Sequence, residues 1–271
     1  MGGGRVAGKK MGGKKVLLVC DIGNTNITLG VYDGEETVFT ARIVTEKNKT
    51  EDQYAVEING IFLFNGCQDI DSAIISSVVP SAQSAICKAV ERLFGIEPLV
   101  LGPGIKTGLN IKIDNPAQLG ADLVAGAVGA ISKYPTPCIV IDMGTATTIS
   151  VINEDKSFVG GAIMAGVNLM LESLYSKTAQ LPQIDIGTPQ SVIGTNTVDS
   201  MKSGVVFGTA AMLDGMIERI QSKLCKKAAI VATGGLACNI VKHCKNEIIY
   251  DRKLLLDGLK IIYEKNSDAS K

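Results

Sequence analysis

The stretch LLVCDIGNTNITLGVYDGEE, residues 17–36, joins a strand pattern to a polar turn. Its apolar run breaks at Asp21, and the next residues are mostly small and polar: Ile22, Gly23, Asn24, Thr25 and Asn26. The same plan returns in CIVIDMGTATTISVINEDKS, residues 138–157, where Asp142 follows Asp21 by 121 residues. The sequence therefore predicts one unit of strand, D-x-G turn, strand, turn and strand in each half of the chain. Because D-x-G turns are common, two unrelated hairpins that begin alike are the alternative.

Hydrophobic periodicity predicts an α/β fold around the two hairpins. Apolar runs bounded by turn residues predict strands at 16–23, 27–34, 37–44, 72–80, 98–102, 138–144, 147–153, 157–166 and 228–235. Helical spacing, with Gly or Pro at several ends, predicts helices at 54–66, 81–95, 120–134, 168–181, 197–224 and 254–266. Residues 102–120 are punctuated by Gly and Pro and are expected to form an extended connector.

The length of the chain indicates more than one domain. Its 271 residues exceed the commonest domain size of about 100–150 residues, and the connector is the best boundary. We expect a flexible tail rich in Gly and Lys at residues 1–14, a first domain at 15–118 and a second domain at 119–271.

Charge and composition narrow the choice of partners. The 27 Lys and Arg balance the 27 Asp and Glu, which argues against a nucleic acid or an anionic membrane as the main partner. Every apolar run is shorter than the ~18 residues of a membrane span. The sequence has seven cysteines, which form no C-x-x-C pair, and only one histidine. We therefore expect free thiols in a reducing cytoplasm and no structural zinc. His243 is interpreted as a surface residue.

Both D-x-G turns have the composition of phosphate-binding loops. Gly lets main-chain N–H groups approach a ligand closely, and small hydroxyl and amide side chains add donors without bulk. A carboxylate there would repel phosphate unless a cation lay between them, so Asp21 and Asp142 imply Mg²⁺ or a monovalent ion. We call residues 21–28 the first loop and residues 142–148 the second loop. A third element, the GG turn ATGGLA at residues 232–237, follows an apolar strand, although a turn without any ligand can use the same residues.

Two such hairpins followed by a late GG turn resemble the actin-like ATPase superfamily, which includes Hsp70 and many sugar kinases. This resemblance implies two ribonuclease-H-like domains with ATP in the cleft between them. From about residue 15 to residue 266 the chain further resembles the type III pantothenate kinase family. The motifs that carry this resemblance, in family order, are DIGNTN (21–26), SSVVP (76–80), GPGIKTG (102–108), NPxxLGAD (115–122), DMGTATT (142–148), GGAIMAG (160–166), GxNT (194–197) and ATGGLA (232–237).

The family resemblance implies transfer of the γ-phosphoryl group of ATP to the primary hydroxyl of pantothenate, the first step of coenzyme A synthesis, by a cytoplasmic homodimer. It implies Asp122 as the general base, Asp142 as the ligand of K⁺ or NH₄⁺, and Asp21 as a candidate ligand of Mg²⁺. The residues implied to bind ATP are Asp21, Ile22, Gly23, Asn24, Thr25, Asn26, Ile27, Thr28, Thr145, Gly234 and Gly235. Those implied to face pantothenate are Ile113, Gly120, Ala121, Asp122, Leu123 and Thr197.

Simpler structural roles compete with several of these assignments. The helix macrodipole favours an acidic residue such as Asp122 in a first turn. Thr197 suits a helix N-cap, a role that can coexist with ligand binding. Asp21 and Asp142 suit turn caps, although their occurrence in both halves favours the functional role.

Two positions depart from the family pattern. The family usually carries Arg directly after the catalytic Asp, where this chain has Leu123, and Tyr seven residues before the motif Gly, where it has Ile113. Loss of a guanidinium removes a planar fork for an anionic group. Three functions therefore stay open: a pantothenate kinase, a kinase of the same fold with another hydroxyl substrate, and a non-catalytic ATP-binding accessory or regulatory protein.

Overall fold

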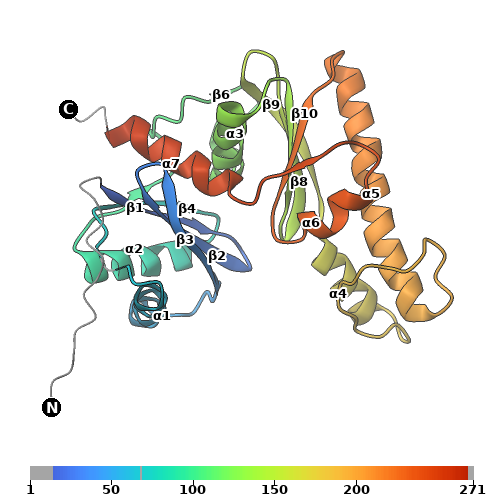
Figure 1. The fold of residues 1–271 in the computed structure, drawn as a ribbon, viewed down its shortest axis with the longest axis horizontal. Helices are drawn as coiled ribbons and strands as arrows, with labels where there is room; N and C mark the ends of the chain where they lie inside the picture. The colour runs from blue at the N-terminus through green and yellow to red at the C-terminus, as the bar shows by residue number, and fades with distance from the viewer. Residues whose placement is uncertain (1–14, 68, 268–271) are drawn as a thin grey trace. The chain divides into compact units, whose positions relative to one another are not determined.

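The protein is an α/β structure with two β-sheets, as the sequence predicts (Figure 1). The computed structural model describes residues 15–67 and 69–267, so the predicted tail at residues 1–14 lies outside the described residues. The chain divides into two compact units. The first contains the described residues up to Thr107, Leu119–Ala125 and the described residues from Leu255 onward; the second contains Gly108–Gln118 and Gly126–Leu254. Each unit combines segments that are distant in the chain, so most of the last helix, from Leu255 onward, belongs to the first unit.

The first unit is built on a five-stranded sheet in the order β3-β2-β1-β4-β5. β1 pairs antiparallel with β2 and parallel with β4, while β2 pairs antiparallel with β3. The three strands predicted from the opening stretch are thus confirmed. The strands are β1 (Val16–Ile22), β2 (Asn26–Asp33), β3 (Glu36–Val44), β4 (Ser72–Ser77) and β5 (Leu99–Val100).

Two capped helices, α1 (Glu51–Phe64) and α2 (Pro80–Phe94), lie on one face of this sheet (Figure 1). Thr50 caps α1: its Oγ1 accepts from the Gln53 N–H, and the Gln53 side chain accepts from the Thr50 N–H. α2 begins with Pro80, which lacks an N–H, and the first N–H groups of a helix have no partner within the helix in any case. Gly95 follows the last residue of α2 and has the left-handed conformation, φ 68°.

The other face of the first sheet is covered by α7 (Leu254–Ser267) (Figure 1). Gly30 on β2 leaves the space that Leu256 fills, because a Cβ there would lie 3.0 Å from Leu256 Cδ1. The Tyr32 hydroxyl donates to Asp257 at 2.7 Å. These contacts explain why α7 packs on β2, although Tyr32 and Asp257 are 225 residues apart in the chain.

The second unit repeats the pairing of the first. Its sheet has the order β11-β10-β7-β8-β9-β6, in which β7 pairs antiparallel with β8 and parallel with β10, and β8 pairs antiparallel with β9. The predicted duplication is therefore confirmed. The strands are β6 (Asn110–Ile111), β7 (Cys138–Met143), β8 (Ala146–Ile152), β9 (Ser157–Ala165), β10 (Ala229–Thr233) and β11 (Ile249–Tyr250).

Helices α4 (Val167–Lys177) and α5 (Thr197–Leu224) pack against β7, β8 and β10 in a second hydrophobic core. Asp214, only 6% exposed on α5, accepts hydrogen bonds from both N–H groups of Asn246 and from the Lys245 N–H. Burial alone would raise the pKa of Asp214, but these bonds outweigh it and hold the pKa below its ordinary value. The remaining helices are η1 (Pro116–Gln118), α3 (Ala121–Lys133), α6 (Ala237–Ile240) and η2 (Val241–His243).

Two expectations are corrected. The helix predicted at 168–181 ends at Lys177, because the Thr178 hydroxyl donates to the Leu174 carbonyl at 2.7 Å and the backbone of Thr178 is extended. His243 is not a plain surface residue: its ring packs edge-on against Phe207 with 5.0 Å between centroids, and its buried Nε2 has no hydrogen-bond partner in the described structure.

The expectation of free cysteines is confirmed, since all seven lie among the described residues and none forms a disulfide. Three of them, Cys20, Cys67 and Cys138, are buried as small apolar residues. Within residues 15–67 and 69–267, no helix has the length and apolar character that crossing a membrane would require.

Candidate functional site

Asp21 is the penultimate residue of β1 and lies in a cross-strand row of polar side chains. Its register partners are Thr28 on β2 and Ser76 on β4. Paired residues on neighbouring strands share a face of the sheet, and Cys20 and Ile22 point to the opposite face, into the core beneath α1 and α2. Ser76 is fully buried, and its hydroxyl has no hydrogen-bond partner among the described residues.

The second sheet contains the same row. Asp142, penultimate on β7, is in register with Thr148 on β8 and Thr233 on β10. Thr148 has a buried hydroxyl that lacks a partner within the described chain. Hydroxyl, carboxylate and hydroxyl thus recur in the same order on equivalent strands. This repetition extends the duplication from strand order to side-chain chemistry.

The first loop combines polar residues at the surface with two core anchors. Asn24, Thr25 and Asn26 are exposed. Ile22 and Ile27, which border them, are fully buried, so the side chains of these two residues are unavailable to a ligand. The Gly23 N–H donates to the Asn26 carbonyl at 3.0 Å and closes the turn.

Three motifs that are separate in the sequence meet at the second loop. The Gly166 N–H, at the end of GGAIMAG, donates to the Thr145 carbonyl at 3.2 Å, and a Cβ on Gly166 would clash with the carbonyl oxygens of Gly144 and Thr145. Gly234 of the GG turn has φ 96°, and a Cβ there would lie 2.5 Å from the carbonyl oxygen of Met143. Both glycines therefore permit backbone contacts that another residue would block.

The predicted general base lies in the first turn of α3. Asp122 is half-buried, and its Oδ1 accepts from the Leu123 N–H at 2.8 Å. Gly120 leaves room for this carboxylate, because a Cβ at Gly120 would overlap Asp122 Oδ1. Burial raises the pKa of Asp122 above its ordinary value, although backbone hydrogen bonds oppose the shift. Such a carboxylate is a better proton acceptor than an exposed one.

Ala121, Asp122 and Leu123 form the first turn of α3, Gly120 directly precedes it, and all four residues belong to the first unit. The other residues predicted to face the acceptor, Ile113 and Thr197, belong to the second unit. Ile113 is half-buried in the segment after β6.

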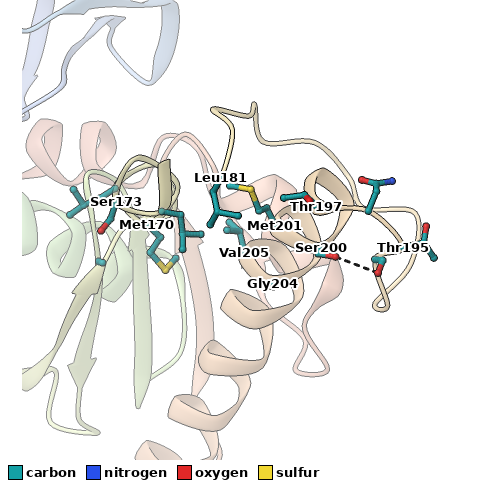
Figure 2. Close-up of a pocket in the computed structure, with 14 residues that line it drawn as sticks. Met170, Ser173, Leu181, Thr195, Thr197, Ser200, Met201, Gly204 and Val205 are labelled. Carbon is teal, nitrogen blue, oxygen red and sulfur yellow. Dashed lines mark hydrogen bonds between the residues drawn. The ribbon is translucent and has the colours of Figure 1, made fainter. Parts of the chain in front are cut away.

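A pocket of about 1110 Å³ lies within the second unit, between α4, the segment after it and the start of α5 (Figure 2). Its walls are mainly apolar, and they include Met170 and Leu174 from α4 and Met201 and Val205 from α5. Polar residues of the GxNT motif, Thr195, Asn196 and Thr197, line the end near the start of α5.

The N-cap of α5 is Asn196, whose side chain accepts from the Asp199 N–H at 2.9 Å. The alternative reading of Thr197 as the N-cap is therefore wrong, because Thr197 is the first helical residue. Sequence reasoning missed the apolar walls of the pocket. No local sequence pattern identifies these walls, because they combine residues of α4, of the segment after it and of α5.

Replacement of Gly234 by Ala tests the packing of the GG turn against the second loop. The Cβ would overlap the Met143 backbone at a positive φ, so we expect a loss of about 1–3 kcal/mol in the free energy of unfolding, measured by urea denaturation. Gly208→Ala is the matched control: it lies on α5 with open space around its Cα, so Ala should leave stability equal or slightly higher. Equal stability of the two variants would contradict the packing described here.

The chain is similar to known proteins over most of its length. A family model described as type III pantothenate kinase matches residues 17–219. The chain is 44% identical over 253 residues to the type III pantothenate kinase of Halalkalibacterium halodurans, covering 93% of this chain and 100% of that protein. It is 46% identical over 255 residues to that of Geobacillus sp. (strain WCH70), covering 93% and 99%.

Solved structures with lower identity show the fold. Component A of (R)-2-hydroxyglutaryl-CoA dehydratase from Acidaminococcus fermentans has a TM-score of 0.57 at 16% identity, covering 95% of this chain and 100% of that one. MreB 5 of Spiroplasma citri has a TM-score of 0.55 at 12% identity, covering 95% and 99%. The fold is thus that of the actin-like ATPases. With the family model matching most of its length, the chain belongs to the type III pantothenate kinase family.

Proposed function

We propose that the protein transfers the γ-phosphoryl group of ATP to the primary hydroxyl of pantothenate, the first step of coenzyme A biosynthesis. The observation that carries this proposal is identity of 44–46% over 93% of the chain to relatives named type III pantothenate kinase. The duplicated rows around Asp21 and Asp142 support it, since they provide two polar loops of the kind that hold phosphates.

ATP would be held mainly by backbone and small side chains. Residues 24–26 offer N–H groups and short polar side chains, and Thr28 offers a hydroxyl beside Asp21. Thr145 would contact the nucleotide from the second loop, and Gly234 and Gly235 would contact its adenosine end. Phosphoryl transfer requires chiefly positioning and charge compensation from a protein, and this set of residues provides both.

The acceptor would be activated by Asp122 and oriented in part by Thr197. Asp122 would accept the proton of the pantothenate hydroxyl, and its buried setting suits that role. Thr197 lines the polar end of the pocket, where the positive end of the α5 dipole favours an anionic group such as a carboxylate. The apolar walls suit the branched hydrocarbon part of pantothenate.

The cations that we propose fit an all-oxygen donor set. Within the described residues, no three or more His, Cys, Asp and Glu side chains gather where they could hold a metal ion. One carboxylate together with hydroxyl and phosphate oxygens is the environment in which Mg²⁺ and similar hard cations are usually bound by kinases. Asp142 with the unpaired Thr148 hydroxyl is the proposed K⁺ or NH₄⁺ ligand set, and Asp21 would face Mg²⁺. Bound cations would offset the repulsion between carboxylate and phosphate.

An assay of the purified protein with ATP, Mg²⁺, K⁺ or NH₄⁺ and pantothenate tests the function. We expect ADP and phosphopantothenate in equal amounts, and Asp122→Asn should lower kcat by about 10²- to 10⁴-fold, since the general base is lost. Because burial raises the pKa of Asp122, the acid limb of the kcat/KM profile should lie above pH ~4, the ordinary range of Asp.

Asp114→Asn is the control for this assay, because Asp114 is an exposed acid on the segment before α3 and should tolerate the change. Full activity of Asp122→Asn would refute the base assignment. Turnover of a different alcohol in place of pantothenate would favour a kinase of the same fold with another hydroxyl substrate. Leu123 and Ile113, which depart from the family pattern, leave that alternative open. ATP binding without turnover of any acceptor would favour the accessory protein.

An ion series tests the proposed role of Asp142. Omission of K⁺ and NH₄⁺, with ionic strength kept by a bulky organic cation, should raise KM for ATP. Asp142→Asn should raise it similarly and should lose the response to either ion. Activity that is indifferent to both ions would show that Asp142 has another role.

We also propose a cytoplasmic homodimer. The seven free cysteines suit a reducing compartment. Exposed large apolar side chains occur on β9, on α4 and before α5. Examples are Ile163, 75% exposed, Val192, 66% exposed, and Ile193, 79% exposed. Apolar surfaces of this kind typically mark contacts with another protein chain. Light scattering in solution should give twice the mass of one chain, and polar substitution of Ile193 should lower it; a single-chain mass for the unchanged protein would contradict the dimer.

A further inference from the structure

The backbone of the first loop is tied from behind by one residue of a neighbouring segment. The Thr45 hydroxyl donates to the Gly23 carbonyl at 2.7 Å. The Thr45 N–H donates to the Thr25 carbonyl at 2.9 Å. Thr45 directly follows β3, so one residue fixes two alternate peptide groups of a loop that lies about twenty residues earlier.

Thr45 is itself held on both sides. On its N-terminal side, β3 pairs with β2 up to the partners Val44 and Asn26. On its C-terminal side, the hydroxyl of Tyr54 accepts from the Glu46 N–H at 3.0 Å and donates to the Glu46 carbonyl at 2.9 Å. Tyr54 is fully buried on α1. Thr45 therefore links the first loop to β3 and to the buried Tyr54 through fixed backbone contacts.

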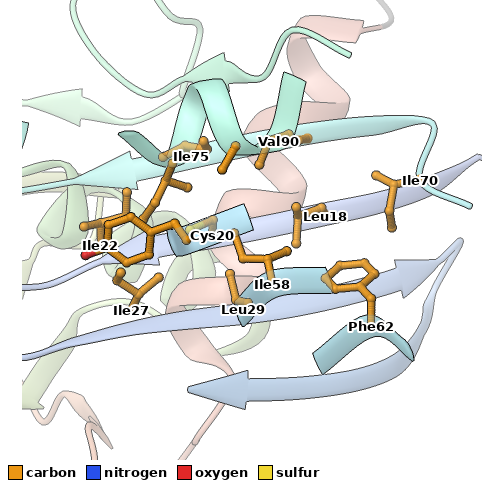
Figure 3. Packing of buried hydrophobic residues seen from close by; sticks show 14 of the residues in the cluster. Leu18, Cys20, Ile22, Ile27, Leu29, Ile58, Phe62, Ile70, Ile75 and Val90 are labelled. Carbon is orange, nitrogen blue, oxygen red and sulfur yellow. The ribbon is translucent and has the colours of Figure 1, made fainter. Parts of the chain in front are cut away.

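The strands that border the loop enter the same core. Ile22, at the end of β1, and Ile27, near the start of β2, pack close to Cys20 and Ile75 (Figure 3). The strand ends are thus fixed, while Asn24, Thr25 and Asn26 between them are exposed. Conformation within this exposed stretch depends on the bonds to its carbonyl groups.

These bonds decide which way the loop amides point. In a trans peptide the C=O and the following N–H point in opposite directions. With the Gly23 and Thr25 carbonyls directed at Thr45, the N–H groups of Asn24 and Asn26 are directed away from it. Two amides turned alike form the beginning of an anion-binding concavity.

We propose that Thr45 is a positioning residue for ATP: it touches no reactant, and it orients the amides of the first loop toward the phosphates. This inference rests on the proposed function, since it takes residues 21–28 as the phosphate site. Loss of the hydroxyl would free the Gly23 carbonyl and let the peptide rotate. Binding of ATP should weaken, while the acceptor side should not respond.

Thr45→Val keeps the shape and the backbone N–H but removes the hydroxyl. From the usual net worth of one hydrogen bond, we expect KM for ATP to rise about 3- to 10-fold, with kcat and KM for pantothenate nearly unchanged. Thr45→Ser, which keeps the hydroxyl, should restore KM for ATP. Thr40→Val is the matched control, an exposed threonine on β3.

A second variant guards against misfolding of Thr45→Val. Tyr54→Phe removes the other anchor and should raise KM for ATP in the same direction, with thermal unfolding measured for every variant. Unchanged KM for ATP in folded Thr45→Val, or equal effects of the Val and Ser changes, would overturn the proposal. Absence of any ATP-dependent turnover by the unchanged chain would instead overturn the proposed function, so the two failures are distinguishable.

Discussion

A carboxylate at the end of a buried strand is the constraint around which both halves of the molecule are built. Removal of a charge from water is costly unless partners compensate it. Asp21 and Asp142 meet this constraint in the same way: each is penultimate on its strand and has a hydroxyl in register on both neighbouring strands. Ser76 and Thr148 keep buried hydroxyls without partners in the described structure, which a purely structural role does not explain. The repetition of the row in both sheets supports the proposed phosphate and cation site.

The loops beside these carboxylates are shaped by contacts from behind, and the two units achieve this differently. In the first unit, Thr45 bonds two loop carbonyls, and Tyr54 holds the segment that carries Thr45. In the second, the backbones of Gly166 and Gly234 pack directly on the loop where a side chain would clash. The first loop is thus supported by a side-chain and a backbone hydrogen bond from Thr45, and the second by close backbone packing together with the bond from the Gly166 N–H. Pre-organisation of this kind is what phosphoryl transfer asks of a protein, because positioning supplies most of the catalysis.

Much of this architecture could be predicted from local sequence signals. Apolar runs bounded by turn residues located the strands of both hairpins, and Gly95 marked a helix end that the structure confirms. The missed features depend on one local contact, at the end of α4, and otherwise on contacts that are distant in sequence. The early end of α4 follows from one hydroxyl at Thr178, and the half-buried position of His243 follows from Phe207 on another helix. The same holds for the candidate site. Sequence motifs identified the two loops, but no local pattern predicted the contact of Thr45 with the first loop or the apolar walls of the pocket. The roles of the individual site residues stay predictions.

The proposal on which the function rests most heavily is that the first loop and the second loop both bind ATP or its cations. A crystal structure of the chain with Mg²⁺, K⁺ and a non-hydrolysable ATP analogue tests this claim most directly. We expect residues of the first loop and of the second loop both to lie within hydrogen-bond distance of oxygens of the same triphosphate or of its bound cations. A triphosphate held by one loop alone, with the other loop facing solvent, would contradict it.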